Sequence, residues 1–310
     1  MLSWFQLCVE YVSVTRFKIQ VMSFGMIQEG LLASGCFLVI IATWWLIQLT
    51  KRYYHSKQRH YDFQSSVTFP CCETLKKHPI EGFFKILSSL SIAIVLFCID
   101  NNNDNTISEG RDKFLTNTEF GTLFTFMMMS GVMDVLASWS KRSFYNGLDY
   151  VAFMMFFAIE ALILMCRSRI ADEPIYTLYQ LNVISALVTL AVIAMEMKYP
   201  DQVLCPLMRS YLVLVQGTWN LQVFYFFNAG PLNIKDGADR SMLLSMYFSW
   251  HCGAAFFVVL LMWILVFKLA QKNCCPCGGV DVGSGSEMVY LENRVRFDYH
   301  LMDRFESDID

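Results

Sequence analysis

A chain of 310 residues in which 55% are hydrophobic and only 16% are charged has too few charges to solvate an ordinary soluble domain. Its net charge of −3 supplies no basic surface for neutralising phosphates, which argues against nucleic-acid binding. The composition predicts an integral membrane protein whose solvent is the lipid bilayer.

Seven apolar stretches meet or approach the roughly 20 residues that a helix needs to cross about 30 Å of hydrocarbon. Together they predict an all-α, polytopic fold, a bundle of seven transmembrane helices. In chain order they cover Leu31–Thr50, Ile80–Ile99, Phe114–Ala137, Leu148–Cys166, Tyr176–Met197, Pro206–Phe227 and Met242–Leu269.

These spans divide the chain into an amino-terminal extension (residues 1–27), a membrane domain (28–270) and a tail (271–310). The extension mixes aromatic residues with Arg16 and Lys18, so it is too polar to span and is predicted to lie at the membrane interface. The tail is rich in glycine and serine, then acidic, and has little to bury, which predicts disorder.

Lys and Arg residues favour the cytoplasmic side of short loops. They are concentrated in the loops after the first, third and fifth spans, and the loop after the fifth span contains Lys198 and Arg209. The loop after the second span is acidic instead. The pattern predicts a lumenal or extracellular amino terminus and a cytoplasmic carboxyl terminus.

Two cysteine groups lie beside predicted helix ends, where S-palmitoylation is chemically feasible. The candidates are Cys71, Cys72, Cys274, Cys275 and Cys277. In the tail, Tyr299 and Met302 bound a Tyr-x-x-apolar sequence, which has the form of an endocytic sorting signal for a trafficking adaptor.

Ionisable side chains at membrane depth are costly unless they face a partner or a water-filled cavity, so each one is a functional candidate. Helix direction sorts them into two layers. The inner layer, near the predicted cytoplasmic ends, contains Glu81, Asp134, Glu196 and Arg209, and the outer layer contains Glu119, Glu160, His251 and Gln222. For the inner layer, a structural ion-pair network and a proton or ion pathway are the alternatives.

In the outer layer, Glu119, Glu160 and His251 offer three ligands for a divalent metal such as zinc. The alternative is a cavity wall in which a carboxylate pairs with His251. In the sixth span, Gln216 and Trp219 share one helix face that is predicted to point inward, either to pack or to bind, and Gly217 allows a neighbouring helix to approach.

The chain resembles the transmembrane protein 45 family of eukaryotic membrane proteins over roughly residues 28 to 270. The residues that carry this resemblance occur in the same order, the most specific being the string in the sixth span. They are Trp44-Trp45, Ile80-Glu81-Gly82, Gly131 to Asp134, Glu160-Ala161, Tyr179-Gln180, Arg209-Ser210, Gln216 to Trp219 with Gln222, and Ser249-Trp250-His251.

The resemblance implies a seven-helix bundle similar in arrangement to microbial rhodopsins, a trimeric homo-oligomer, and residence in Golgi, endosomal or plasma membranes. It implies no particular biochemical activity. Members of that family carry histidines that this chain lacks, and in their places it has Leu31, Glu119, Phe120, Arg167, Arg169 and Tyr179.

Three functions stay open from the sequence. The first is a non-enzymatic transporter, channel or small-ligand or ion-binding protein that uses the buried carboxylates. The second is an intramembrane metal-dependent hydrolase, in which zinc would activate water, and the third is a trafficking or scaffold protein. A retinal pigment is rejected because residues 242–267 contain no lysine for a Schiff base. A G-protein-coupled receptor is disfavoured because the third span ends in Ser138-Trp139-Ser140-Lys141-Arg142 and the seventh lacks an Asn-Pro-x-x-Tyr element.

Overall fold

A computed structural model describes the backbone of residues 2–59, 62–69, 79–100, 107–139, 147–169, 171, 175–229 and 237–271. Side chains are described from Gly30 onward, except at residues 59, 96–100, 107–117, 227–229, 237–238 and 240. The chain divides into two units, Met1–Cys274 and Cys275–Asp310. The predicted sorting signal and both cysteine groups lie outside the described residues.

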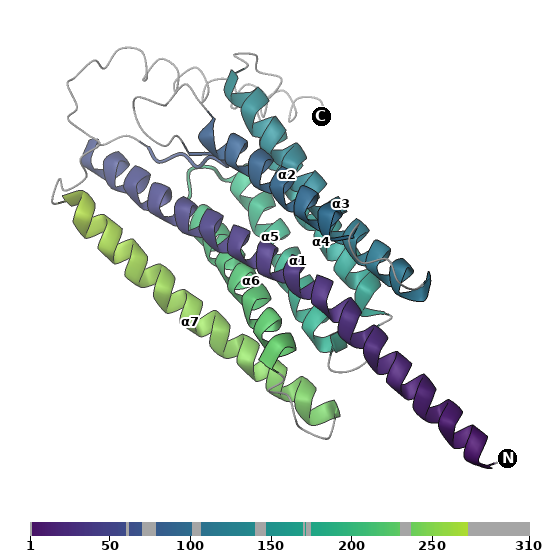
Figure 1. Cartoon of the computed structure of the whole chain (residues 1–310). Helices are drawn as coiled ribbons and strands as arrows, with labels where there is room; N and C mark the ends of the chain where they lie inside the picture. The colour runs from purple at the N-terminus through teal and green to yellow at the C-terminus, as the bar shows by residue number, and fades with distance from the viewer. Residues whose placement is uncertain are drawn as a thin grey trace, which may run out of the picture. The chain divides into compact units, whose positions relative to one another are not determined.

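The described residues form seven helices, shown in Figure 1. They are α1 (Leu2–Arg59), α2 (Ile80–Asp100), α3 (Ile107–Trp139), α4 (Leu148–Ser168), α5 (Ile175–Lys198), α6 (Leu204–Ala229) and α7 (Gly237–Gln271). The end of the bundle where α1, α3, α5 and α7 end is called the inner end below, and the opposite end is the outer end.

Hydropathy located most helix boundaries to within a few residues. The main differences are at both ends of α1, which covers Leu2–Arg59 instead of Leu31–Thr50, and at the start of α3, which begins at Ile107 instead of Phe114. These additions are too polar for a hydrocarbon span but do not prevent a helix from continuing into water or the interface. The side chains of residues 2–29 are not described, so the interfacial placement of the extension stays a prediction.

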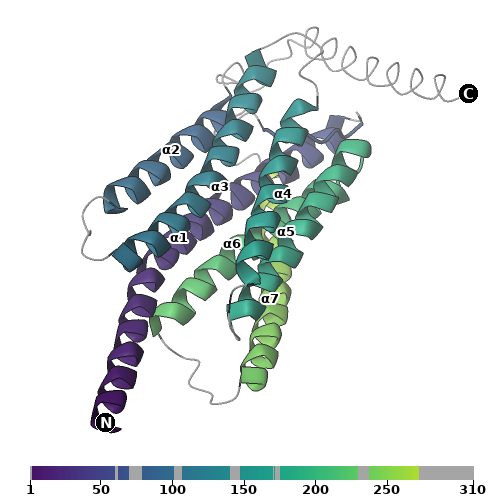
Figure 2. The same ribbon diagram turned by 90° about the vertical axis from the view of Figure 1, so that its right-hand side faces the viewer.

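The helices associate mainly in three antiparallel pairs, α1 with α6, α2 with α3, and α4 with α5. Figure 2 shows the last two pairs side by side. α1 also contacts α3 and α7, so it lies at the centre of the packing, and its Trp45 and Leu49 are fully buried. Large apolar side chains from α1, α4, α5 and α6 surround them in one continuous core.

Glycines allow two of these helix pairs to approach closely. A Cβ atom at Gly217 on α6 would lie 2.8 Å from the Cβ of Leu38 on α1, and one at Gly131 on α3 would lie 2.8 Å from the carbonyl oxygen of Gly82 on α2. Small residues promote such contacts in membranes, where helices gain by close packing and not by burying surface from water. The approach predicted at Gly217 is therefore present, and α1 is the neighbouring helix.

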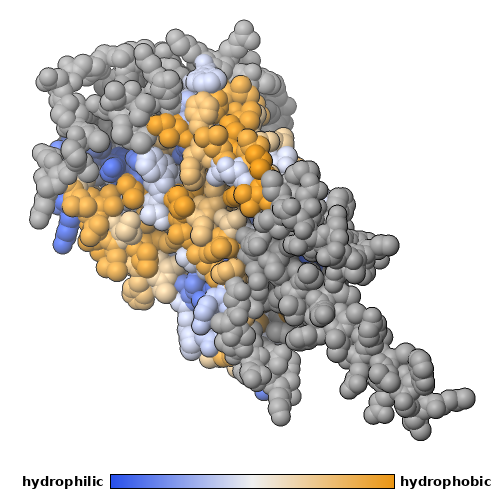
Figure 3. Space-filling view, in the orientation of Figure 1, coloured by the Kyte–Doolittle hydropathy of each residue, from blue (hydrophilic) through white to orange (hydrophobic). Residues whose placement is uncertain are grey.

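Five helices are long and apolar enough to cross a membrane, counting only residues whose side chains are described. α6 is not among them because its polar groups lower its hydropathy, and the side chains of α2 are described only to Val95. Large apolar residues such as Phe257 and Leu261 on α7 are two-thirds exposed, as expected for a surface that faces lipid. In Figure 3, hydrophobic residues cover much of the described surface. The five spans are Gly30–Gln58, Thr118–Trp139, Leu148–Ser168, Ile175–Lys198 and Ser241–Gln271.

Candidate functional site

Lys85 forms a buried ion-pair group between α2 and α3 near the inner end. Its side chain is 0% exposed, and its Nζ donates a hydrogen bond of 2.7 Å to Oδ2 of Asp134. The same Nζ lies 3.5 Å from Oε1 of Glu81, one helical turn away, and 5.0 Å from the ring centre of Phe153. One lysine is thus held between two carboxyl groups and an aromatic face.

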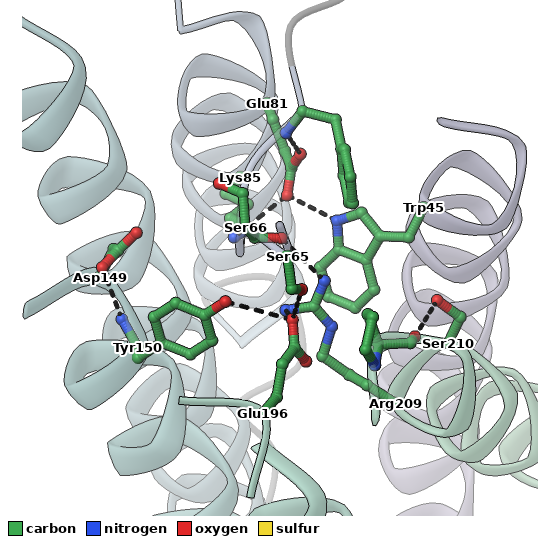
Figure 4. A network of polar contacts seen from close by, with 12 residues as sticks. Trp45, Ser65, Ser66, Glu81, Lys85, Asp149, Tyr150, Glu196, Arg209 and Ser210 are labelled. Atoms are coloured by element: carbon green, nitrogen blue, oxygen red, sulfur yellow. Dashed lines mark hydrogen bonds and ion pairs between the residues drawn. The ribbon is translucent and has the colours of Figure 1, made fainter. Parts of the chain in front are cut away.

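A second buried pair joins α5 to α6. Nη1 of Arg209 lies 3.2 Å from Oε1 of Glu196, and both side chains are fully buried. The same Glu196 oxygen accepts hydrogen bonds from the hydroxyl of Ser65 and, at 3.2 Å, from the hydroxyl of Tyr150 (Figure 4). Arg209 was counted in the sequence as a charge of the loop after α5, but the structure shows it inside the bundle.

Trp45 of α1 connects the two pairs. Its indole N–H donates to Oε1 of Glu81 at 2.6 Å, and the guanidinium carbon of Arg209 lies 4.7 Å from the centre of its ring. We call Trp45, Glu81, Lys85, Asp134, Glu196 and Arg209 the inner network. The four inner-layer residues predicted from the sequence therefore lie in one network. Of its other two members, Lys85 was recognised from the sequence as a charge at membrane depth but was assigned to neither layer, and Trp45 was given no place in a site.

Residues 62–69, between α1 and α2, fold against the inner network, and we call them the inner plug. The backbone N–H of Phe69 donates to Oε2 of Glu81 at 3.1 Å, and Nη2 of Arg209 donates to the carbonyl oxygen of Ser66 at 3.2 Å. The backbone N–H of Ser65 donates to the carbonyl oxygen of Pro200 between α5 and α6. Phe63 and Phe69 are buried. Apolar residues in a loop are a sequence feature that is consistent with packing against the bundle.

The inner network is closely paired but not electrically balanced. Two cations, Lys85 and Arg209, face three carboxyl groups, so the network is neutral only when one carboxyl group holds a proton. Within the described part of the chain, most of its polar atoms have partners. The arrangement fits a structural network that holds five helices and the inner plug together.

A separate cavity of about 70 Å³ lies among α1, α3, α4, α5 and α6 on the outer side of the inner network. Its walls are mostly apolar, and it is large enough for several water molecules or a ligand group of a few heavy atoms. We call it the outer cavity. Its polar lining residues are Ser34, Glu119, Glu160, Arg167, Tyr179, Asn182 and Asn220.

Glu119 and Arg167 form an ion pair at the outer end of this cavity, which we call the entrance pair. Nη1 of Arg167 donates to both carboxylate oxygens of Glu119, at 2.8 and 2.9 Å. The Arg167 side chain is 17% exposed and that of Glu119 is 32% exposed. Each charge therefore has its counter-charge within the pair, and neither needs a ligand to satisfy it.

Glu160 has a different environment although it lines the same cavity. It is 7% exposed, and its Oε2 has no hydrogen-bond partner in the described part of the chain. Gln216 of α6 lies close enough to interact with the Glu160 carboxyl group, but neither amide atom of Gln216 makes a hydrogen bond of ordinary geometry with a described residue. Glu160 is thus a buried acid beside an amide, without a built-in counter-charge.

A chain of hydrogen bonds crosses the cavity wall from α5 to α1. Nδ2 of Asn182 donates to Oδ1 of Asn220 at 3.1 Å, and Nδ2 of Asn220 donates to Oγ of Ser34 at 3.3 Å. Oγ of Ser34 in turn donates to the carbonyl oxygen of Leu31. Sequence reasoning missed these residues because single amides and hydroxyls carry no pattern of their own.

The other two predicted outer-layer residues lie elsewhere. His251 and Gln222 do not line the outer cavity, and the imidazole of His251 packs edge-on against the ring of Trp219, with centroids 5.9 Å apart. Within the described ranges, no group of three or more His, Cys, Asp or Glu side chains is arranged to hold a metal ion. Glu119 and Glu160 share a cavity, but the residues do not fit the predicted zinc site.

Two comparisons relate this chain to known proteins. Residues 146–232 match the model of a family described as a family of unknown function, DUF716. The human protein transmembrane epididymal protein 1 is 24% identical over 188 residues, which cover 58% of this chain and 68% of the relative. With five apolar helices of spanning length, this chain is a multi-pass membrane protein.

The family match extends over α4, α5 and α6. It therefore includes one wall of the outer cavity, with Glu160 and Asn182, and the buried pair of Glu196 and Arg209. Five of the six positions at which the sequence resemblance implies histidines also line the outer cavity. The positions at which this chain has another residue in place of an implied histidine therefore lie mostly around the outer cavity.

Proposed function

We propose that this membrane protein is non-enzymatic and binds a small ligand in the outer cavity. The observation that carries the proposal is the carboxyl group of Glu160, which is buried beside an internal space and has an oxygen without a partner in the described residues. A buried acid kept for structural reasons normally has a cation built in, as Asp134 has Lys85 and Glu196 has Arg209 in the inner network. Glu160 fits a group whose partner arrives from outside the chain.

The other functions considered have less support. A metal-dependent hydrolase needs a ligand set, but Glu119 is engaged by Arg167 and His251 packs against Trp219. A trafficking or scaffold role depends on residues 272–310, which lie outside the described part of the chain. The outer cavity therefore supports ligand binding best.

A cavity-filling variant tests the proposal. Leu123 lines the cavity, whereas Leu162 on α4 is 53% exposed on the lipid side. Leu123→Phe reduces the cavity, and Leu162→Phe makes the same chemical change outside it. The assay is thermal unfolding in detergent with 1-propanol, propanoate or n-propylammonium, whose sizes match the cavity volume.

At least one compound is expected to raise the midpoint saturably for the parent and Leu162→Phe but not for Leu123→Phe. If no compound stabilises the parent, or if both variants respond alike, the cavity is not a ligand site.

We also propose that α2 and α6 cross the membrane, giving seven spans arranged as in microbial rhodopsins, and that the chain is a divergent relative of the transmembrane protein 45 family. In support, each of these helices packs along a helix of spanning length. Because Arg209 is buried, the predicted orientation rests mainly on the basic loops after α1 and α3.

Impermeant thiol labelling of Arg169→Cys and Lys57→Cys tests this orientation. Both positions are exposed at opposite ends of the bundle. In intact cells, labelling above the level given by the native cysteines is expected only for Arg169→Cys. If labelling increased only for Lys57→Cys, the orientation would be the opposite of the predicted one.

A further inference from the structure

The geometry points to a specific ligand class for the outer cavity: a small primary alkylammonium ion, held by Glu160 and Asn182. This inference rests on the proposed function, because it names the ligand that the cavity would take. Its basis is the balance of charge and of hydrogen-bond acceptors around Glu160.

The charge balance of the cavity favours a cation. The entrance pair is internally neutral, since Glu119 and Arg167 satisfy each other. Glu160 forms no ion pair within the described part of the chain, and its polar neighbour there is the amide of Gln216. An ionised carboxylate in this position is strongly stabilised by a cation that comes with the ligand.

The hydrogen-bond chain of the cavity wall fixes the orientation of Asn182. The Ser34 hydroxyl uses its proton on the Leu31 carbonyl, so toward Asn220 it acts as an acceptor. That directs Nδ2 of Asn220 toward Ser34 and its Oδ1 toward Asn182. Asn182 must then donate through Nδ2, which leaves its Oδ1 as an acceptor without a described partner.

Two acceptors without a described partner consequently belong to residues that line the cavity: Oε2 of Glu160 and Oδ1 of Asn182. A primary ammonium group has three N–H donors and can satisfy both of them. An alcohol has one donor, and a carboxylate has none and would repel Glu160. The match in donor number and charge therefore selects an amine.

The cavity walls and volume define the rest of the ligand. Phe37, Phe124 and Phe156 line the space and offer aromatic faces to an alkyl chain or to the ammonium group. A volume of about 70 Å³ is roughly half of a cavity known to hold benzene, which limits the buried part to about four heavy atoms. A bare metal cation would need more oxygen ligands than these walls supply.

Calorimetric titration in detergent tests the ligand class. The probes are n-propylammonium, tetramethylammonium (a cation without N–H donors), 1-propanol and NaCl at equal ionic strength, all at pH 7.5, where the propylamine is protonated. The parent should bind n-propylammonium saturably and at least tenfold more tightly than each of the others.

Glu160→Gln removes the charge and keeps the shape of the side chain. It should weaken n-propylammonium at least tenfold and leave 1-propanol unchanged. Asp201→Asn, an equivalent change at an exposed position between α5 and α6, should alter neither. If Glu160→Gln does not fold, the selectivity of the parent among the four probes decides.

The outcomes separate the two proposals. Binding of 1-propanol without preference for the amine, or equal amine binding by parent and Glu160→Gln, would overturn the ligand class and leave the cavity as a ligand site. Binding of tetramethylammonium as tight as that of propylammonium would show that charge acts without hydrogen bonds to the two acceptors, and would also overturn the ligand class. Binding of no probe would overturn both proposals.

Discussion

Replacing Gly131 with alanine tests whether close contact between α2 and α3 is needed for stability. The new Cβ would lie 2.8 Å from the carbonyl oxygen of Gly82, 2.9 Å from Cβ of Lys85 and 3.0 Å from Cγ1 of Ile86. The first two belong to or adjoin helix backbone and cannot rotate away. To restore an ordinary contact of 3.4 Å, the helices must separate by about 0.6 Å, the difference between 3.4 and 2.8 Å.

This separation acts on a neighbouring interaction. The hydrogen bond between Lys85 and Asp134 also joins α2 to α3, and its 2.7 Å length would increase by a similar amount. Overpacking of this kind costs about 1–3 kcal/mol, whereas alanine in place of glycine gains up to about 1 kcal/mol in helix propensity. We expect a net loss of up to about 2 kcal/mol, and a melting temperature lower by up to about 8 °C.

Gly121→Ala is the matched control on the same helix, because a Cβ there meets nothing within 4 Å. It should be neutral or slightly stabilising in the same assay, thermal unfolding in detergent followed by tryptophan fluorescence. If Gly131→Ala were as stable as Gly121→Ala, the tight helix contact would not limit stability and the reasoning would be refuted.

Two further substitutions address the ion pairs. Lys85→Met leaves Asp134 buried without its cation and should lower the free energy of unfolding by about 3–5 kcal/mol. Adding Asp134→Leu should recover much of that loss. If Lys85→Met were as stable as the parent in thermal unfolding, the assigned role of the pair would be contradicted. Glu119→Gln at the half-exposed entrance pair should cost no more than about 1 kcal/mol, and less at high salt, so a loss of several kcal/mol would show that the entrance pair has a larger role.

The helices were largely predictable from the sequence because each span is an apolar run bounded by polar residues. Residues that favour helix ends also mark some boundaries, since Pro206 lies close to the start of α6 and Gly147 directly precedes α4. The long extension of α1 was not predictable in this way, since helix formation outside the hydrocarbon depends on propensity and not on hydropathy. The prediction that α2 and α6 span is not tested by the present structure.

The layers of buried charge were predictable, but their partners were not. Counting along each helix gives the depth of Glu81, Asp134 and Glu160, whereas the pairing of Lys85 with Asp134 depends on which helices become neighbours. His251 illustrates the limit: its depth suggested a place beside Glu160, but its helix face directs it toward Trp219. A metal site needs the correct face as well as the correct depth.

The outer cavity does not extend to the inner end of the bundle. None of the described cavity-lining residues belongs to the plug or to the inner network, and the plug is anchored at Glu81, Arg209 and Pro200. A solute that reaches Glu160 must therefore leave by the side on which it arrived, unless these anchors and the ion pairs behind them come apart together. Passage of a solute from the outer cavity to the inner end would therefore require a second conformation, in which residues 62–69 and the inner network separate from the bundle.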